Sequence, residues 1–323
     1  MRAGFLVVDK PPGITSHDVV AAVRAVTGIK KVGHTGTLDP FATGVLPLAL
    51  GGATRLIQYL DESVKVYDAT IAFGRATDTG DLTGQTVREA PLPEAGLDEV
   101  QGVLAGFLGE RMQRPPAYSA VKKDGKPLYW YARKGEAVEV PPRPITLYDL
   151  QVLAYDGAML GVRIECSRGT YARVLAGEIG EALGSAGHLE ALCRPRSGPF
   201  YLEDAVDLGT LAALVAAEPG HTWQEVLLSR GRKEERVPWR PRDDVRRALE
   251  RWIRRPLDVL THLPLADVRP SDARRVANGG PPPPAPASCG VGDRYLVVSG
   301  DALIAIAELT AQGPSTVRVV PPG

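Results

Sequence analysis

Residues 33–50 constrain the chain more than any other stretch of its sequence. Three glycines fall within twelve residues at its start, so the backbone can bend tightly and approach a ligand where a Cβ atom would be in the way. Asp39 ends the turn and precedes Pro40, which fixes its own φ and pushes its predecessor toward an extended conformation. The apolar run at residues 43–50 would anchor the loop in a core. The pattern therefore predicts a loop that presents a single carboxylate.

On local grounds the chemistry of this loop is open. A lone carboxylate beside His34 and three threonines suits nucleophilic or general-base work, but an ordinary Asp-Pro turn explains the same residues more simply. The spacing from Gly28 through Gly33 to Thr35 is close to that of a phosphate-binding loop. His34 stands where that loop needs its lysine, and a helix rather than a strand is expected before it. Nucleotide hydrolysis at this loop is therefore excluded.

The charge of the chain is balanced, with 38 Lys and Arg against 38 Asp and Glu. Its 44% hydrophobic residues are ordinary for a globular protein, and 323 residues suffice for one large domain and a smaller one. Affinity for RNA would therefore need local clusters of positive charge. Residues 1–60 hold six Lys or Arg against three Asp, and residues 230–255 hold eleven against five acids. A solvated, salt-bridged helix face explains the second cluster equally well.

The three cysteines, Cys166, Cys193 and Cys289, lie far apart with no paired spacing. This predicts a reducing compartment and argues against a disulfide framework or a zinc site. No segment resembles a signal peptide, and no apolar run approaches the roughly 18 residues of a membrane span. We therefore expect a cytoplasmic protein with no membrane segment and no metal.

Apolar periodicity predicts alternating strands and helices. Ser16 is expected to cap a helix that ends at Gly28, and Thr170 to cap a helix that follows a β-hairpin. Tyr67 begins the buried face of a strand, and Leu108 is expected to point inward near the end of a helix. Strands are expected at residues 5–9, 64–73, 145–154, 159–166, 294–298, 304–309 and 316–320, and further helices at 53–60, 98–110 and 271–278, with two helical stretches between 208 and 262, where Trp239 and Trp252 lie.

A resemblance to a known family gives the loop a chemistry. The TruB family, the bacterial tRNA pseudouridine-55 synthases, has a catalytic motif that residues 33–46 closely resemble, with the sequence Gly33-His34-Thr35-Gly36-Thr37-Leu38-Asp39-Pro40-Phe41-Ala42-Thr43-Gly44-Val45-Leu46. Further segments match other family motifs, namely residues 115–122, 168–173 and 188–194. The loop at residues 75–81 resembles the family's Thr-Asp-Thr loop, to which the sequence assigns no role.

The resemblance implies three catalytic residues. Asp39 matches the essential nucleophile of the family, Arg173 the arginine that pairs with it, and Tyr171 the tyrosine beside the reacting ring. Such a pair has a physical use, because a guanidinium favours the ionised carboxylate even in a pocket that excludes water. From the residues alone, Arg173 could instead cap the end of a strand.

Three more residues are implied to hold the substrate. Tyr67 would pack against the target base, Leu192 would close the pocket over it, and His34 would fill the gap that a flipped base leaves. On periodicity alone Tyr67 is a core aromatic, Leu192 could equally belong to the core, and His34 would stabilise the loop. Cys193 departs from the family, which more often has arginine there.

Charged and aromatic residues around these motifs suit contact with RNA. Residues 115–129 mix prolines, aromatics and lysines in an extended run. Such a run would suit one side of a binding surface for single-stranded RNA, although a surface loop is an equally good interpretation. Binding through such groups should weaken as salt is added. The candidates for contact with RNA are Lys10, Lys31, Tyr118, Lys122 and Arg194.

The family also implies an α+β fold. A pseudouridine-synthase catalytic domain, with a mostly antiparallel mixed sheet flanked by helices, is expected at residues 1–262. A small C-terminal β-barrel domain of the PUA type, which binds RNA, is expected at residues 263–323. The prolines at residues 281–284 depart from the pattern expected there.

The activity implied by the resemblance is the isomerisation of uridine 55 in the T-arm of tRNA to pseudouridine. The aspartate would act on a flipped-out base, at C1′ of the sugar or at C6 of the base, without a cofactor. A monomer with no obligatory protein partner is expected. Two alternatives stay open: the catalytic subunit of a guide-RNA-dependent pseudouridine synthase, and an RNA-binding or tRNA-folding module whose catalysis is secondary.

Overall fold

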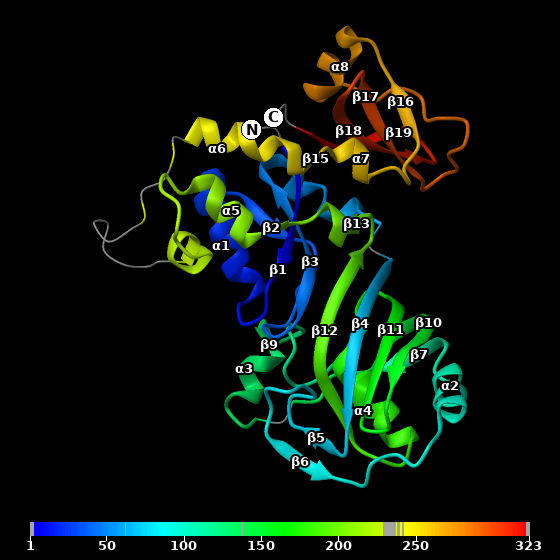
Figure 1. Ribbon diagram of the computed structural model, residues 1–323. Coiled ribbons are helices and arrows are strands. Elements are labelled where there is room, and N and C mark those ends of the chain that lie inside the picture. The colour runs from blue at the N-terminus through cyan, green and yellow to red at the C-terminus, as the bar shows by residue number, and fades with distance from the viewer. Residues whose placement is uncertain are drawn as a thin grey trace. The chain divides into compact units, whose positions relative to one another are not determined.

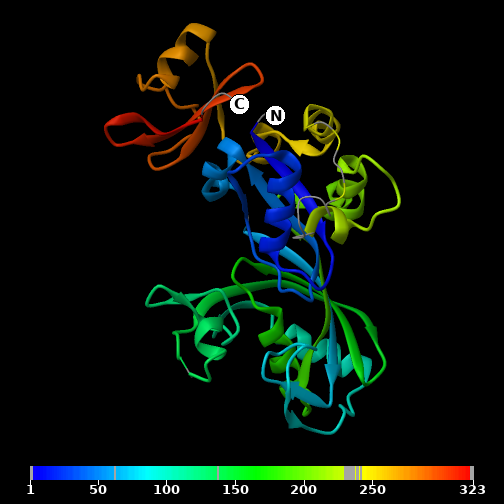
Figure 2. The ribbon, with the colours of Figure 1, turned by 90° about the vertical axis from the view of Figure 1, so that its left-hand side faces the viewer.

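The computed structural model describes residues 3–61, 63–136, 138–228, 237, 240 and 242–320. The chain divides into two compact units. Figure 1 labels their helices and strands, and Figure 2 shows the same ribbon from a second direction. The fold is α+β, as the sequence predicts, with a mixed sheet, flanking helices and a small C-terminal sheet. The first unit contains Met1–Asp39, Val45–Asp61 and Pro199–Gly323, and the second contains Pro40–Gly44 and Glu62–Gly198.

In the first unit, both faces of the sheet are covered by other elements. Along β1 (Gly4–Lys10), Leu6 and Val8 enter one hydrophobic cluster, whereas Phe5 and Val7 enter another. A strand buried on both faces has a continuous apolar sequence. The strand predicted at residues 5–9 is confirmed, and the apolar run at residues 43–50, which was expected to lie in a core, is a second strand of this kind. The other strands of this part are β3 (Thr43–Leu50), β2 (Val32–His34), β14 (Val206–Asp207) and β15 (Ile253–Arg254).

Helix α1 (Ser16–Thr27) contributes to the first of these clusters. Its cap lies one residue before the predicted Ser16, because Thr15 and Asp18 form a capping box. The Thr15 hydroxyl accepts from the Asp18 N–H at 3.1 Å, and the Asp18 carboxylate accepts from the Thr15 N–H at 3.0 Å. Ser16 is therefore the first helical residue, and its hydroxyl bonds elsewhere. Helices α5 (Leu208–Val215) and α6 (Arg242–Leu249) contribute to the same cluster.

The C-terminal part of the first unit is a four-stranded sheet in the order β16-β17-β18-β19, which fits the expected PUA type. Along β17, Leu296 and Val298 join the cluster of Phe5, whereas Tyr295 and Val297 join a separate cluster that includes a residue of α8. This sheet thus shares a core with the N-terminal strands. The predicted strands and short helix are confirmed as β17 (Arg294–Ser299), β18 (Ala302–Thr310), β19 (Gly313–Val319) and α8 (Pro270–Ala277), preceded by β16 (Leu265–Asp267).

One predicted helix of the first unit is wrong. Residues 53–60 form two 3₁₀ turns, η1 (Gly51–Arg55) and η2 (Ile57–Tyr59), because the glycines at the start disfavour an α-helix. Of the basic run, residues 230–236 and Trp239 lie outside the described residues. Trp252 packs half-buried on the first cluster, with the Arg251 guanidinium 3.8 Å from its ring. The remaining elements are η3 (Leu202–Asp204), a π-helical turn (Gln224–Leu228), η6 (Glu250–Trp252), α7 (Pro256–Val259) and β13 (Phe200–Tyr201).

The second unit is built on strands in the order β12-β4-β11-β10-β7. The predicted alternation of β4 (Val64–Phe73) is confirmed, because Tyr67, Ala69 and Ile71 are buried and their neighbours are half-buried. All neighbours in this run pair antiparallel, whereas the start of β3 pairs parallel with β12. The predicted hairpin is confirmed as β10 (Arg143–Tyr155) and β11 (Met159–Ser167), next to β12 (Gly187–Ser197) and β7 (Gly109–Gln113).

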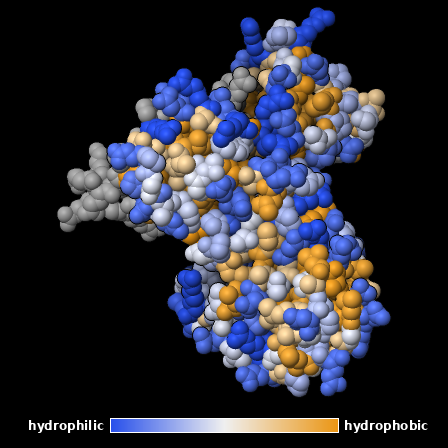
Figure 3. Space-filling view, viewed as in Figure 1, coloured by the Kyte–Doolittle hydropathy of each residue, from blue (hydrophilic) through white to orange (hydrophobic). Residues whose placement is uncertain are grey.

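Helices α2 (Leu97–Ala105) and α4 (Ala172–Ala182) lie on the same face of this sheet (Figures 1 and 2). α2 ends before the predicted residue 110, because the chain turns at Gly109, whose φ is +95°, into β7. Leu108 is consequently 44% exposed rather than inward, and Figure 3 shows apolar side chains gathered over β7 and β10. The small elements of this unit are β5 (Arg75–Thr77), β6 (Thr86–Glu89), β8 (Lys122–Lys123), β9 (Lys126–Pro127) and α3 (Leu128–Ala132).

Candidate active site

The loop that carries Asp39 leaves β2 in a fixed direction, because β2 is paired with β3. His34 lies opposite Leu48 in this antiparallel pair. One residue further on, the Thr35 N–H donates to the Pro47 carbonyl at 3.1 Å, which extends the pairing into the loop. The backbone of His34 is therefore held by the sheet of the first unit.

Just before Asp39, the same loop is tied to helix α1. The Ser16 hydroxyl accepts from the Leu38 N–H at 2.9 Å and donates to the Leu38 carbonyl at 3.1 Å. Both residues are 3% exposed. A single buried hydroxyl thus satisfies both backbone groups of the residue next to Asp39. Sequence reasoning missed this contact, because it joins positions 22 residues apart.

Ser16→Ala is expected to lower both stability and turnover. Removing the hydroxyl leaves two buried backbone groups of Leu38 without this partner, at a cost of about 1–3 kcal/mol. Thr15→Ala is the matched control, since it removes the cap of the same helix for about 1 kcal/mol without touching Leu38. Urea denaturation and single-turnover kinetics would separate the two effects: only Ser16→Ala should slow the reaction. Equal rates in the two folded variants would contradict this role for Ser16.

Gly44 meets protein backbone rather than a ligand. Its φ is +97°, and a Cβ atom there would lie 2.5 Å from the carbonyl oxygen and 2.8 Å from the nitrogen of Arg194. Backbone cannot give way as a flexible side chain would, so the position needs glycine. The close approach expected at Gly44 is therefore real, but its partner is β12, where Arg194 pairs with Gly44.

The pairing of β4 with β12 places Tyr67 and Leu192 on one face of the second unit's sheet. Leu192 lies opposite Ala69, two residues beyond Tyr67, so the two candidate side chains are diagonal neighbours. Tyr67 is 9% exposed and Leu192 is 7% exposed. The register therefore brings together two of the three predicted substrate-binding residues. The third, His34, belongs to the first unit.

Helix α4 approaches β12 closely because both carry glycine at the crossing. A Cβ atom at Gly187 would lie 2.5 Å from the Ala176 carbonyl oxygen, and one at Gly180 would lie 2.5 Å from the Gly187 nitrogen. Any larger residue at either position would push the helix from the sheet. The middle and the C-terminal half of α4 are thereby held against the sheet of their own unit.

The first residues of α4 include two candidate catalytic residues. Tyr171 is the N-cap and Arg173 the second helical residue. The predicted cap, Thr170, is wrong by one position, because its hydroxyl donates to the Ser167 carbonyl at 2.9 Å instead. Tyr171 is half-buried, and Arg173 is 6% exposed.

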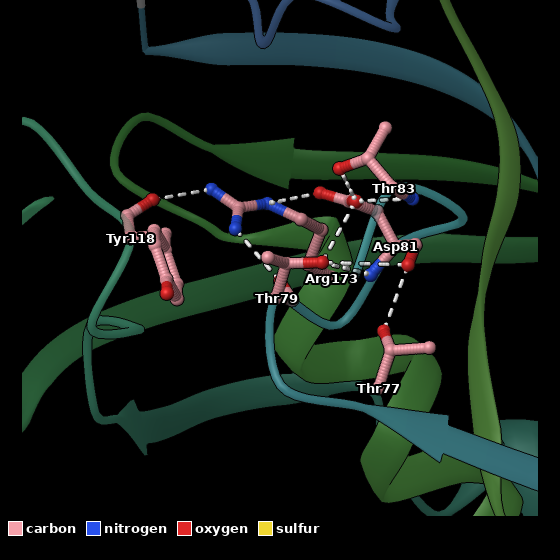
Figure 4. Close-up of polar contacts among 6 residues, drawn as sticks. All are labelled: Thr77, Thr79, Asp81, Thr83, Tyr118 and Arg173. Atoms are coloured by element: carbon pink, nitrogen blue, oxygen red, sulfur yellow. Dashed lines mark hydrogen bonds and ion pairs between the residues drawn. The ribbon is translucent and has the colours of Figure 1, made fainter. Parts of the chain in front are cut away.

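Three groups hold the Arg173 guanidinium (Figure 4). Nη1 donates to the Thr79 carbonyl at 2.8 Å, and Nη2 donates to the Tyr118 carbonyl at 2.7 Å. Nε lies 3.8 Å from the Asp81 carboxylate. A guanidinium carries five N–H donors in a rigid plane, and two parallel donors of such a group match the two oxygens of a carboxylate.

The Thr-Asp-Thr loop, which the sequence left without a role, supports this arginine. The Asp81 carboxylate accepts from the Thr79 hydroxyl at 2.8 Å and from the Thr83 N–H at 2.9 Å, and the Asp81 carbonyl accepts from the Thr77 hydroxyl at 2.7 Å (Figure 4). Asp81 is 4% exposed. The loop therefore presents a buried, oriented carboxylate to Arg173.

Asp81→Asn is expected to destabilise the protein by about 3 kcal/mol, because it leaves a buried guanidinium without its charged neighbour. Turnover should fall in the same variant, since Arg173 would lose part of its alignment. Asp78→Asn is the control, because the exposed Asp78 carboxylate accepts from the Gln85 N–H at 2.8 Å and the amide oxygen of asparagine can still accept there. Denaturation midpoints and turnover should both stay near wild type in that control. Identical behaviour of the two variants would argue against the role of Asp81.

The candidates for contact with RNA divide by exposure. Lys31 and Lys122 are exposed and Tyr118 is half-buried, so all three have surface available to a ligand. Lys10 and Arg194 have 0% exposure. This corrects the prediction for these two, because a fully buried side chain cannot reach a phosphate in this conformation.

Cys166 is unsuited to act as a rival nucleophile. Burial raises the pKa of its thiol to about 11, so the sulfur is protonated at neutral pH. Its Sγ lies 3.7 Å from the Lys65 carbonyl.

Across the part of the chain that the structure describes, no helix has the length and apolar character needed to cross a membrane.

The mixed sheet and the small C-terminal sheet fit the pseudouridine synthase class, and the comparisons with known proteins identify the chain as one of its members. Residues 24–172 match the model of a protein family described as "TruB family pseudouridylate synthase (N terminal domain)". A tRNA pseudouridine synthase B from Geobacter sulfurreducens is 45% identical over 279 residues, 86% of this chain and 82% of that protein. One from Francisella philomiragia is 48% identical over 212 residues, 65% of this chain and 70% of that protein. The chain belongs to the TruB family.

Solved structures agree on the fold. A chain in a Cbf5-Nop10-Gar1 complex is 27% identical with a TM-score of 0.65, covering 99% of this chain and 84% of that one. A chain in the archaeal box H/ACA sRNP Nop10-Cbf5 complex is 26% identical with a TM-score of 0.66, covering 99% and 86%. The predicted catalytic fold and C-terminal sheet domain are thus supported over nearly the whole chain.

Proposed function

We propose that this chain isomerises uridine 55 in the T-arm of tRNA to pseudouridine. The observation that carries the proposal is the loop of Asp39, which lies within the matched residues 24–172 and is tied to β3 and to Ser16. The tRNA pseudouridine synthase B of Geobacter sulfurreducens is 45% identical, whereas the matched chains of the two Cbf5 complexes are 26–27% identical. This difference favours the tRNA enzyme over a guide-RNA-dependent subunit.

The reaction breaks the bond between C1′ and N1, turns the uracil and joins C1′ to C5. N1 gains a proton and C5 loses one, so the atoms balance without a co-substrate or a cofactor. In this proposal Asp39 is the nucleophile, at C1′ or at C6, and must be ionised. Arg173, whose guanidinium is held by the carbonyls of Thr79 and Tyr118, would keep it so, because a nearby positive charge favours the ionised carboxylate. The pairing of Asp39 with Arg173 is a prediction of this proposal.

The target uridine must leave its stack before it can react. We assign Tyr67, Leu192 and Tyr171 to the flipped ring, and His34 to the gap that it leaves. The exposed Lys31 and Lys122, with Tyr118, would grip the RNA, and this grip should weaken with salt. Residues 1–262 would act as the catalytic domain and residues 263–323 as an RNA-binding domain, in a cytoplasmic monomer without a protein partner.

The proposal is tested by mapping pseudouridine in a T-arm stem-loop incubated with the purified chain alone. Modification at the position of uridine 55 is expected. Activity that appears only with a guide RNA and added proteins would support the guide-dependent alternative instead. Tight tRNA binding without any modification would identify an RNA-binding or tRNA-folding module.

A further inference from the structure

A buried amide, Gln113, contacts the start of α4 at two points. Gln113 is the last residue of β7 and is 2% exposed. Its Oε1 accepts from the Tyr171 N–H at 2.8 Å, and its Nε2 donates to the Tyr171 carbonyl at 3.2 Å. The side chain therefore pairs with the backbone of Tyr171 much as a neighbouring strand would.

The Tyr171 carbonyl has further hydrogen-bond donors besides Gln113, whereas Gln113 is the acceptor that the Tyr171 N–H uses. The Tyr171 carbonyl also accepts from the N–H groups of Val174 and Leu175, at 3.1 and 3.2 Å, as the first turn of α4 closes. The Tyr171 N–H lies before that turn and has Gln113 as its partner. The Tyr171 side chain makes no capping hydrogen bond to α4. Gln113 thus supplies the contact that places the N-cap residue.

The segment that follows Gln113 makes a further contact with the first turn of α4. Five residues later, the Tyr118 carbonyl accepts from Nη2 of Arg173 at 2.7 Å. One short segment therefore holds the backbone of Tyr171 at its start and the guanidinium of Arg173 at its end. A shift of β7 or of this segment would move both candidate catalytic residues together.

We propose that Gln113 is a positioning residue for the reaction: it sets where α4 begins and so places the Tyr171 ring and the Arg173 guanidinium. Only a side chain with a donor and an acceptor in one plane satisfies both Tyr171 groups. Glutamate, when ionised, lacks the donor, and methionine lacks both. The inference rests on the proposed function.

Gln113→Met tests this inference, because it keeps a long side chain but removes both hydrogen bonds. The single-turnover rate constant on a T-arm stem-loop should fall by about 100-fold, the effect of a small misplacement of catalytic groups. The dissociation constant for the RNA should stay at the wild-type value. Gln113→Glu should show a loss in the same direction.

Ser185→Ala is the matched control at the other end of α4. Ser185 is 2% exposed, accepts from the Gly74 N–H at 3.2 Å and donates to the Pro91 carbonyl at 2.6 Å. Its loss should lower the melting temperature without changing the rate constant of the folded enzyme.

A double-mutant cycle with Arg173→Ala separates positioning from a merely structural role. If Gln113 acts by placing Arg173 and Tyr171, Gln113→Met should slow the Arg173→Ala enzyme far less than it slows wild type. Additive losses, or a wild-type rate constant in folded Gln113→Met, would overturn the inference. Absence of modification by the wild-type chain would instead refute the proposed function itself.

Discussion

The Asp39→Asn variant is expected to bind tRNA as wild type does and to form no detectable pseudouridine. An amide has nearly the shape of a carboxylate but is a far weaker nucleophile. The rate constant should therefore fall by about 10⁶-fold, the scale seen when an enzyme's nucleophile is removed. The loop itself should be preserved, because the contacts of Ser16 with Leu38 do not involve this side chain. Single-turnover kinetics and a filter-binding assay measure the two quantities separately.

Asp18→Asn is the matched control for loss of an acid in the first unit. Asp18 closes the capping box with Thr15, and the amide oxygen of asparagine can still accept from Thr15. This variant should keep its full rate. Substantial turnover by Asp39→Asn would show that another group is the nucleophile.

Arg173→Lys is expected to reduce turnover by about 1,000-fold, as when a preorganised charge-stabilising donor is removed. Lysine keeps the positive charge but replaces a rigid fork of five donors by one flexible ammonium. It cannot contact Thr79, Tyr118 and Asp81 and still offer paired donors to a carboxylate. Binding of tRNA should change little, because this buried guanidinium is held by protein groups. Rate and affinity are measured as for Asp39→Asn.

Arg163→Lys provides the matched control for an arginine in the second unit. Arg163 binds Asp68 through two bonds of 2.7 Å across β11 and β4, and its side chain is 45% exposed. Exposed pairs of this kind contribute little to stability, and turnover should not change. Equal losses of turnover and affinity in Arg173→Lys would contradict its pairing with Asp39.

Local patterns predicted the parts of the fold that depend on neighbouring residues. The alternation from Val64 to Phe73 marks β4 because side chains alternate between the faces of a strand. The apolar run after Asp39 was expected to lie in a core, and it does so as β3, a strand with both faces buried. Helix starts follow single residues less closely: Thr15 rather than Ser16 caps α1, because Asp18 completes a capping box with Thr15.

Contacts between distant positions set the parts that the sequence could not reveal. Ser16 reaches Leu38, and Gln113 reaches Tyr171, across 22 and 58 positions, without a spacing that marks either pair. Asp81 gained a role only when the fold placed it beside Arg173. The burial of Lys10 could likewise not be predicted from the sequence. Lysine is almost never fully buried, and this one stands at the end of a strand, next to a turn.

A crystal structure of the chain bound to a T-arm stem-loop tests the central claim most directly. We expect the Asp39 carboxylate within about 4 Å of the Arg173 guanidinium, in ion-pair range, and against the flipped uridine between Tyr67 and Leu192. A carboxylate turned to bulk solvent, beyond the reach of a bridging water from Arg173, would contradict the assignment of Asp39 as the nucleophile.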